Sequence, residues 1–132
     1  MAKREKATAP ARFATHEAYF AAVPVEVRPL LEGIQATVES LLPQASRCIS
    51  YNLPAFRDTR VFFYFAAFRH HIGIYPPVTR DAVLIEALAP YRGPKGNLSF
   101  PLDQPLPLAL IGRVAVALHG EYVRGEGESK AK

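Results

Sequence analysis

An apolar run rich in aromatic residues, Val61 to Phe68, constrains the fold of this chain more than any other segment. It is far shorter than the roughly 20 apolar residues that a membrane-spanning helix needs. A polar turn, 57–60, precedes the run, and Arg69 and His70 follow it. An apolar run of this length between turn signals is typical of a central strand that is covered on both faces. We therefore expect a sheet with residues 61–68 near its middle.

The segments on either side of this run alternate apolar and polar residues, as half-buried strands do. Residues 47–51 alternate before Pro54, and the chain can continue as a strand over 55–57. Residues 71–75 alternate again, and 97–100 can form one further short strand. Because only short turns separate the first members, they predict an antiparallel meander.

Helical periodicity occurs before and after these strands. Residues 25–42 carry apolar side chains at steps of three and four, which predicts one amphipathic helix. Thr15 is expected to cap a short helix before it. Further helices are expected over 79–89, with Thr79 as the cap, and over 107–119. The order α-α-β-β-β-β-α-β-α predicts an α+β fold, an antiparallel sheet of about five strands with helices packed on it.

The length and the charge distribution point to one domain with charged ends. The chain has 132 residues, 49% of them apolar, which suits a single core. We expect a flexible basic arm over 1–14, one domain over 15–122 and a flexible charged tail over 123–132. Residues 15–43 have a net charge of −3, and residues 47–95 have +4. Such a separation gives the surface a dipole that steers charged partners without identifying them.

Cysteine usage and the N-terminal sequence predict a cytoplasmic protein without a membrane partner. Cys48 is the single cysteine, so the chain cannot form an internal disulfide. The basic start is followed by no apolar stretch of the kind that a signal peptide has. No histidine lies near Cys48 in the sequence, which argues against a cysteine nucleophile.

Candidate metal ligands have unfavourable spacing. His70 and His71 are adjacent, and neighbouring strand residues point to opposite faces. Glu32 and Glu39 are roughly 10 Å apart along their helix, so they do not chelate one ion. Together with Glu26 they remain weak candidates for a hard cation. We therefore assign no metal site.

Two further patterns have simpler structural interpretations. The loop from Arg92 to Asn97 loosely resembles an anion-binding loop, but its glycines also suit a tight turn. Arginines at 57, 60 and 69 flank the aromatic run, as in sheets that stack nucleic-acid bases. Such sheets expose their aromatic residues in alternation, which the run 61–68 does not show. A core strand is therefore favoured, and nucleic acid is not an expected partner.

Three sequence blocks together resemble a known bacterial family. They are CISYNLPAF, FAAFRHHIGIYPP and PYRGPKGNLSFPLDQPLPLALI, in this order. Over about Thr15 to Tyr122 the chain resembles the YdhG-like domain, a family largely described as of unknown function. One branch is described as a frataxin-like intracellular iron chaperone, so the resemblance implies iron as one candidate cargo. No iron-ligand motif of that branch matches this chain residue by residue.

The resemblance marks residues from separate segments that could converge on a groove at one sheet face. They are Tyr51, Asn52, His71, Tyr75, Arg92, Lys95 and Asn97. A groove with these polar tips would suit a small anion or the polar end of a ligand. No nucleophile–base pair is evident among them, so no catalytic residue is assigned.

Three functions remain open from the sequence. The favoured one is a non-enzymatic binding or carrier domain for a small ligand or a client protein, with iron handling as one form of it. The second is a protein-interaction module, acting as a monomer or a homodimer. The third is an enzyme with His71 as general base beside Tyr51 or Tyr75, for which no reaction can be named.

Overall fold

The computed structural model of the chain describes residues 12–124. Within these residues, five strands form one antiparallel sheet in the order β2-β3-β4-β5-β6. The strands are β2 (Ser46–Ser50), β3 (Leu53–Asp58), β4 (Arg60–Ala67), β5 (His71–Tyr75) and β6 (Leu98–Pro101). Strands that are consecutive in the chain are also neighbours in the sheet, so the predicted meander is confirmed.

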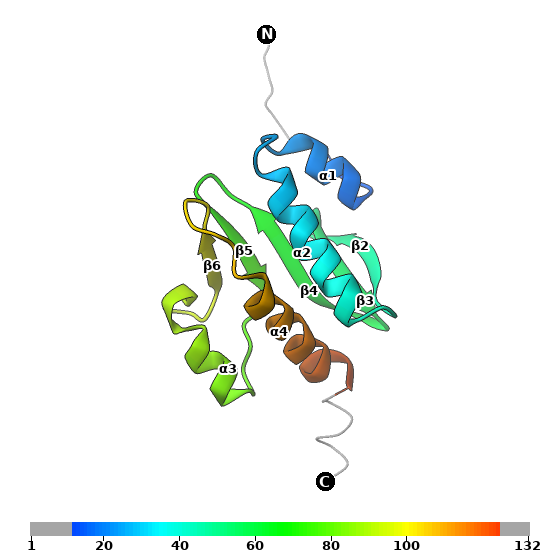
Figure 1. The fold of residues 1–132 in the computed structure, drawn as a ribbon. Coiled ribbons are helices and arrows are strands. Elements are labelled where there is room, and N and C mark those ends of the chain that lie inside the picture. The colour runs from blue at the N-terminus through cyan, green and yellow to red at the C-terminus, as the bar shows by residue number, and fades with distance from the viewer. Residues whose placement is uncertain (1–11, 125–132) are drawn as a thin grey trace.

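The helices lie mainly on one side of this sheet. They are α1 (His16–Ala22), α2 (Arg28–Leu41), α3 (Ala82–Ala87) and α4 (Leu108–His119), with a 3-10 turn η1 (Ala89–Tyr91) and a π-helical turn η2 (Gly120–Arg124). Figure 1 shows α1, α2 and α4 in front of the sheet and α3 near the edge formed by β6. The α+β class and the expected order of helices and strands are confirmed.

The face of the sheet beneath the helices forms the core. Its side chains are fully or almost fully buried: Phe56, Phe63, Phe65, Ile72, Ile74, Leu98 and Phe100. They pack in one cluster with apolar residues of α2 and α4. Burial of such side chains contributes about 1.5–3 kcal/mol each, so this face supplies much of the stability of the fold.

The opposite face, which we call the open face, is not covered by α1, α2 or α4 (Figure 1). Tyr64 of β4 lies on it and is only half-buried. The expectation that the strand over 61–68 is covered on both faces holds for the face beneath the helices, whereas on the open face Ala66 is buried and Tyr64 only half-buried. A register shift after Phe56 leaves Phe62 out of the pairing, and the consecutive Phe62 and Phe63 are both fully buried, so β4 does not alternate over its first half.

Several expected boundaries also change. Pro54 lies inside β3, not at the end of a strand. Asp81, not Thr79, caps α3, because its carboxylate accepts a hydrogen bond from the Leu84 amide at 3.0 Å. Thr15 does cap α1, as expected. Residues 1–11 and 125–132 of the expected arm and tail lie outside the described residues.

The C-terminal end of the described chain is held by a buried carboxylate. Glu121 in η2 accepts hydrogen bonds from the Thr79 amide and hydroxyl, both at 2.9 Å, and from the Arg80 amide at 3.1 Å. These contacts fix the segment before α3. No local sequence pattern predicts this ordered turn, because its partners lie about forty residues earlier in the chain.

Candidate functional site

The turn between β2 and β3 presents an aromatic ring on a backbone that tyrosine disfavours. Tyr51 and Asn52 both have positive φ, at 54° and 60°, as a two-residue hairpin turn of type I′ requires. Such a turn favours Asn-Gly, and a left-handed residue other than glycine costs about 1–2 kcal/mol. Tyr51 is also 86% exposed, so burial does not offset this cost. Backbone strain of this kind clusters at functional sites.

Next to this turn, Tyr64 of β4 and Tyr75 of β5 start from neighbouring strands on the open face. The ring centroids of Tyr51 and Tyr64 are 5.9 Å apart. Tyr64 in β4 is directly opposite Tyr75 in β5. Side chains opposite each other on neighbouring strands are in contact range. Tyr51 and Tyr64 are therefore in ring contact, and Tyr75 extends this row of tyrosines to the adjacent strand without a ring contact to Tyr64.

Gly73 leaves room for aromatic rings to lie over β5. A Cβ atom added at Gly73 would be 2.7 Å from Tyr75 Oη and 3.0 Å from Phe68 Cε2. Phe68 in turn stacks on His71, with ring centroids 4.9 Å apart and an interplanar angle of 23°. The row of tyrosines thus continues along β5. We call this set the aromatic track: Tyr51, Tyr64, Tyr75, Phe68 and His71.

The polar side-chain atoms of the aromatic track make no hydrogen bonds within the described part of the chain. The hydroxyls of Tyr51, Tyr64 and Tyr75 have no hydrogen-bond partner among residues 12–124, nor do the ring nitrogens of His71. Tyr19, under the helices, differs: its hydroxyl accepts a hydrogen bond from the Ala67 amide at 3.0 Å, and burial raises its pKa. The open-face tyrosines therefore keep their donors and acceptors available for a ligand.

The charge on the open face is of one sign. The strand residues that face the same side as Tyr64 include no acidic one: Ser46, Cys48, Ser50, Leu53, Ala55, Arg57, Val61, Ala66, His71, Gly73, Tyr75, Ser99 and Pro101. Arg57 is the cation among them. Burial raises the pKa of the Cys48 thiol, and the opposing effect of Arg57 is smaller. Cys48 is therefore not an activated nucleophile.

The loop 92–97 lies beside the end of β5. The Gly93 amide donates to the Asn97 carbonyl at 2.8 Å, and Gly96 has a positive φ of 88°. A Cβ atom added at Gly96 would be 3.2 Å from both Arg92 Nη2 and Pro77 Cβ. Nη1 of Arg92 is buried and has no hydrogen-bond partner. Arg92 bridges Leu98, a core residue, so the exposed Lys95 is the cation that this loop offers near the end of β5.

The structure brings together some of the seven residues that the sequence marked. Tyr51, His71 and Tyr75 share the open face, while Arg92, Lys95 and Asn97 belong to the neighbouring loop, where Lys95 and Asn97 are exposed. Asn52 has a different role, since its side-chain oxygen accepts a hydrogen bond from the Phe13 amide at 2.8 Å. The sequence missed Tyr64 and Phe68. The one sequence feature that could have indicated an open-face position is the hydroxyl of Tyr64 in an otherwise apolar run.

The candidate metal ligands do not form a cluster. Within residues 12–124, no group of three or more histidine, cysteine or acidic side chains could hold a metal ion. Glu39 pairs with Arg47, which lowers the pKa of its carboxyl, while Glu26 and Glu32 are exposed. His70 lies at an exposed bend before β5. Iron handling stays a prediction from the family resemblance.

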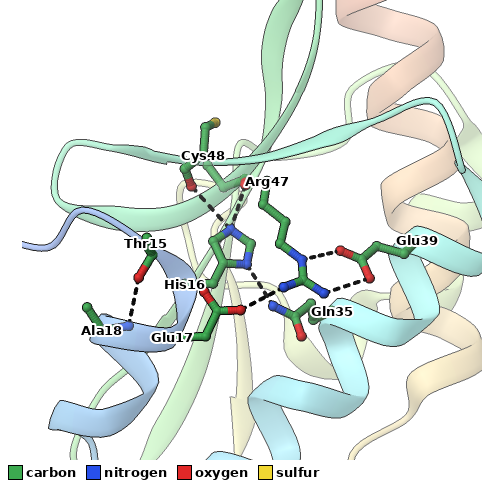
Figure 2. Close-up of polar contacts among 9 residues, drawn as sticks. Thr15, His16, Glu17, Ala18, Gln35, Glu39, Arg47 and Cys48 are labelled. Atoms are coloured by element: carbon green, nitrogen blue, oxygen red, sulfur yellow. Dashed lines mark hydrogen bonds and ion pairs between the residues drawn. The ribbon is translucent and has the colours of Figure 1, made fainter.

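A buried polar cluster supports the Tyr51 hairpin from the helix side (Figure 2). Nε2 of His16 donates to the carbonyls of Ala55 at 2.9 Å and Cys48 at 3.2 Å, and Nδ1 accepts from the Gln35 amide at 3.0 Å. Burial lowers the pKa of His16, so the ring is neutral. Because both ring nitrogens of His16 have partners within the protein, this histidine joins α1 and α2 to the hairpin and has no nitrogen left for a ligand.

Arg47 adds an ion-pair network beside this histidine. Its guanidinium donates to Glu17 at 2.7 Å and to Glu39, so β2 is bound to both α1 and α2. Figure 2 shows that the acidic groups of this network lie on the helix side of the sheet. The acidic helical region and the more basic sheet region that the sequence indicated therefore meet at Arg47.

No helix within the described part of the chain is long and apolar enough to cross a bilayer.

Comparisons with known proteins support the fold. No family model and no curated protein matches the chain. Among solved structures, it is similar to a protein of the DUF1801 family, YdhG from Bacillus subtilis, with a TM-score of 0.68 and 16% sequence identity. The similarity covers 83% of this chain and 94% of that chain. The chain therefore has the YdhG-like fold, the α+β architecture of this DUF1801 protein.

Proposed function

We propose that this chain is a non-enzymatic, cytoplasmic binding domain that holds a small planar anion on its open face. The observation that carries the proposal is Tyr51, an exposed ring kept on a left-handed backbone where glycine would be more stable. Because neither burial nor a hydrogen bond within the described residues explains the tyrosine, a ligand contact is the best reason for it.

The aromatic track favours a ligand with a planar ring. Offset-stacked or edge-to-face ring contacts contribute about 0.5–1.5 kcal/mol beyond the burial of their area. The ring centroids of Tyr51 and Tyr64 are 5.9 Å apart, with their planes tilted by 43°, and the hydroxyls at their tips have no partner among the described residues. A planar ligand would gain both stacking and hydrogen bonds there.

The charges favour a ligand that is anionic. Arg57 lies on the open face itself, and Lys95 is exposed in the adjoining loop without an ion-pair partner among the described residues. No acidic strand residue opposes them on this face. A charge-assisted hydrogen bond to such a cation contributes about 1.5–3 kcal/mol when it is partly shielded from water.

An enzymatic function has less support. A general base needs a partner within hydrogen-bond reach, and His71 stacks on Phe68 with no nucleophile bonded to it. The protein-interaction alternative would use the same exposed rings, but the cations Arg57 and Lys95, with no acidic strand residue on this face, favour an anion as the occupant.

Calorimetric titration with four probes tests the proposal. AMP and 1-naphthoate carry a ring and a negative charge, whereas adenosine lacks the charge and inorganic phosphate lacks the ring. We expect the first two to bind, and the last two to bind at least about tenfold more weakly, because each loses one of the two contributions. Tyr64→Leu should weaken AMP binding by about tenfold or more.

Val116→Ala is the matched control. Val116 is a 46% exposed apolar residue on α4, and α4 packs on the side of the sheet opposite the open face. This substitution should leave AMP binding unchanged. If neither AMP nor 1-naphthoate binds, or if Tyr64→Leu binds them as tightly as the parent protein, the proposed function is wrong.

A further inference from the structure

We propose that the open face binds single-stranded nucleic acid, with successive bases on the aromatic track and phosphates at the flanking cations. This inference rests on the proposed function and names the polymer that would supply the planar, anionic units. Four features of the face support it: the length of the track, the position of the cations, the alternation of β4 and the distribution of acidic residues.

The aromatic track is longer than one planar ligand needs. Tyr51 and Tyr64 have centroids 5.9 Å apart, and Phe68 and His71 form a second pair 4.9 Å apart. Between the pairs, Tyr75 lies on the strand next to Tyr64, where strand spacing is about 4.8 Å. Successive bases of a single strand are about 3.4 Å apart when stacked and farther apart when splayed. The spacing of the track therefore suits two or three successive bases.

Cations flank the track at positions that suit phosphates between bases. Arg57 lies on β3, two residues from Ala55, which is opposite Tyr64. On the other side, Lys95 is exposed in the loop before β6, next to Gly96, whose Cα side lies close to Pro77 just after Tyr75. A strand that crosses the sheet along the tyrosines would pass from one cationic group to the other.

The alternation that base-stacking sheets require is present in β4. After the irregular position at Phe62, the side chains of Phe63 and Phe65 point into the core, whereas Tyr64 and Ala66 face the open side. The sequence run 61–68 hides this pattern because phenylalanine, tyrosine and alanine all count as apolar. The structural objection to a base-stacking sheet therefore does not hold.

The acidic residues are arranged so that a polyanion would approach the open face. Glu17 and Glu39 lie on the helix side, where Arg47 pairs with both of them. The open face has no acidic strand residue. Electrostatic steering would therefore orient a nucleic acid toward the aromatic track. Since stacking accepts any base, we expect little sequence preference.

Fluorescence anisotropy with labelled eight-nucleotide oligo(U), oligo(dT) and a duplex of the same length tests this inference. We expect both single strands to bind at least tenfold more tightly than AMP, and the duplex to bind at least tenfold more weakly than the single strands. Two phosphate contacts predict that log K falls with log salt concentration with a slope of about −1.4.

Variants separate stacking from charge. Tyr64→Leu and Tyr51→Ala should each weaken oligo(U) binding by about tenfold, since stacking on one ring contributes this much. Lys95→Gln should reduce the magnitude of the salt slope by about 0.7. Val116→Ala should change neither quantity. Circular dichroism checks that Tyr64→Leu folds. If that variant does not fold, Tyr51→Ala alone tests the stacking contribution, because Tyr51 lies on an exposed turn and its truncation removes no buried contact.

The outcomes distinguish this inference from the proposed function. If AMP binds in a Tyr64-dependent way but oligo(U) and oligo(dT) bind no more tightly than AMP, the nucleic-acid inference is wrong and the proposed function stands. If the oligonucleotides bind equally well to Tyr64→Leu and Tyr51→Ala, the attraction is only electrostatic and the inference is also wrong. If neither AMP, 1-naphthoate nor oligonucleotides bind, both proposals fail.

Discussion

The two faces of the sheet are both rich in aromatic rings, yet they use them differently. Under the helices the rings are phenylalanines with no exposed surface, such as Phe56, Phe63 and Phe65. On the open face three of the rings are tyrosines whose hydroxyls have no partner among the described residues, and Phe68 and His71 lie beside them. The difference teaches that full burial under the helices, more than the type of ring, separates residues that stabilise the fold from residues that a ligand can reach.

The largest expected effect comes from truncating a ring on the helix-covered face. Phe65 contacts the rings of His16, Phe20 and Phe56 at centroid distances of 5.6–6.1 Å and is fully buried. Phe65→Ala should lower the free energy of unfolding by about 3–5 kcal/mol, because it removes buried surface and leaves a cavity. Urea denaturation measures this loss.

The neighbouring Tyr64→Ala is the matched control on the open face. Since Tyr64 is only half-buried, its truncation should cost about 1 kcal/mol or less. Equal losses of stability in the two variants would contradict the division between the faces.

The buried His16 gives the helix-covered face a pH dependence. Burial lowers the pKa of His16 below its unfolded value of about 6.5, so the unfolded chain binds more protons at mildly acidic pH. The stability that His16 contributes is fully present above this value and is lost as the pH falls below it. Urea midpoints measured from pH 7.5 to pH 5 should therefore decrease, and His16→Gln should reduce that decrease.

His70→Gln is the control for the pH series, because His70 is exposed at a bend and has no buried partner. It should keep the pH dependence of the parent protein. An unchanged dependence in His16→Gln would show that other groups cause it.

A methyl group at Gly73 should affect binding more than stability. The added Cβ would displace the end of the Tyr75 side chain and the edge of Phe68, both of which can move toward solvent. We expect Gly73→Ala to change the free energy of unfolding by less than about 1 kcal/mol. AMP binding should weaken severalfold, as measured by calorimetry, because two rings of the track are shifted. Unchanged AMP binding would show that the positions of the Tyr75 and Phe68 rings over Gly73 do not contribute to binding.

The smallest expected effect concerns the backbone of Tyr51. Tyr51→Gly removes the left-handed strain, whereas Tyr51→Ala keeps it, so the glycine variant should be the more stable by about 1 kcal/mol. Both variants should bind AMP more weakly than the parent protein. An alanine variant as stable as the glycine variant would mean that the turn stores no strain for function.

Much of the fold could be predicted because it depends on local periodicity. The helical stripe of 25–42 and the alternation of 71–75 correspond to α2 and β5 with shifts of a few residues. The same parity argument placed His71 and Tyr75 on one face. Boundaries that depend on a cap, such as Asp81 in place of Thr79, are less readable because both residue types can cap.

The rest of the site depends on contacts between distant segments. Asn52 meets the Phe13 amide 39 residues earlier in the chain, and His16 meets the Ala55 carbonyl across the same separation. Neither pairing leaves a local pattern. Tyr64 was missed for a different reason, since the irregular pairing around Phe62 obscures the alternation of β4.

Mapping of amide chemical shifts on titration with AMP tests the central claim that the open face is the binding face. We predict that the largest changes occur at Tyr51, Tyr64, Gly73 and Tyr75, with smaller changes in the loop 92–97 and none in α2 or α4. Changes concentrated in α1, α2 or α4, or no changes at saturating AMP, would contradict the account.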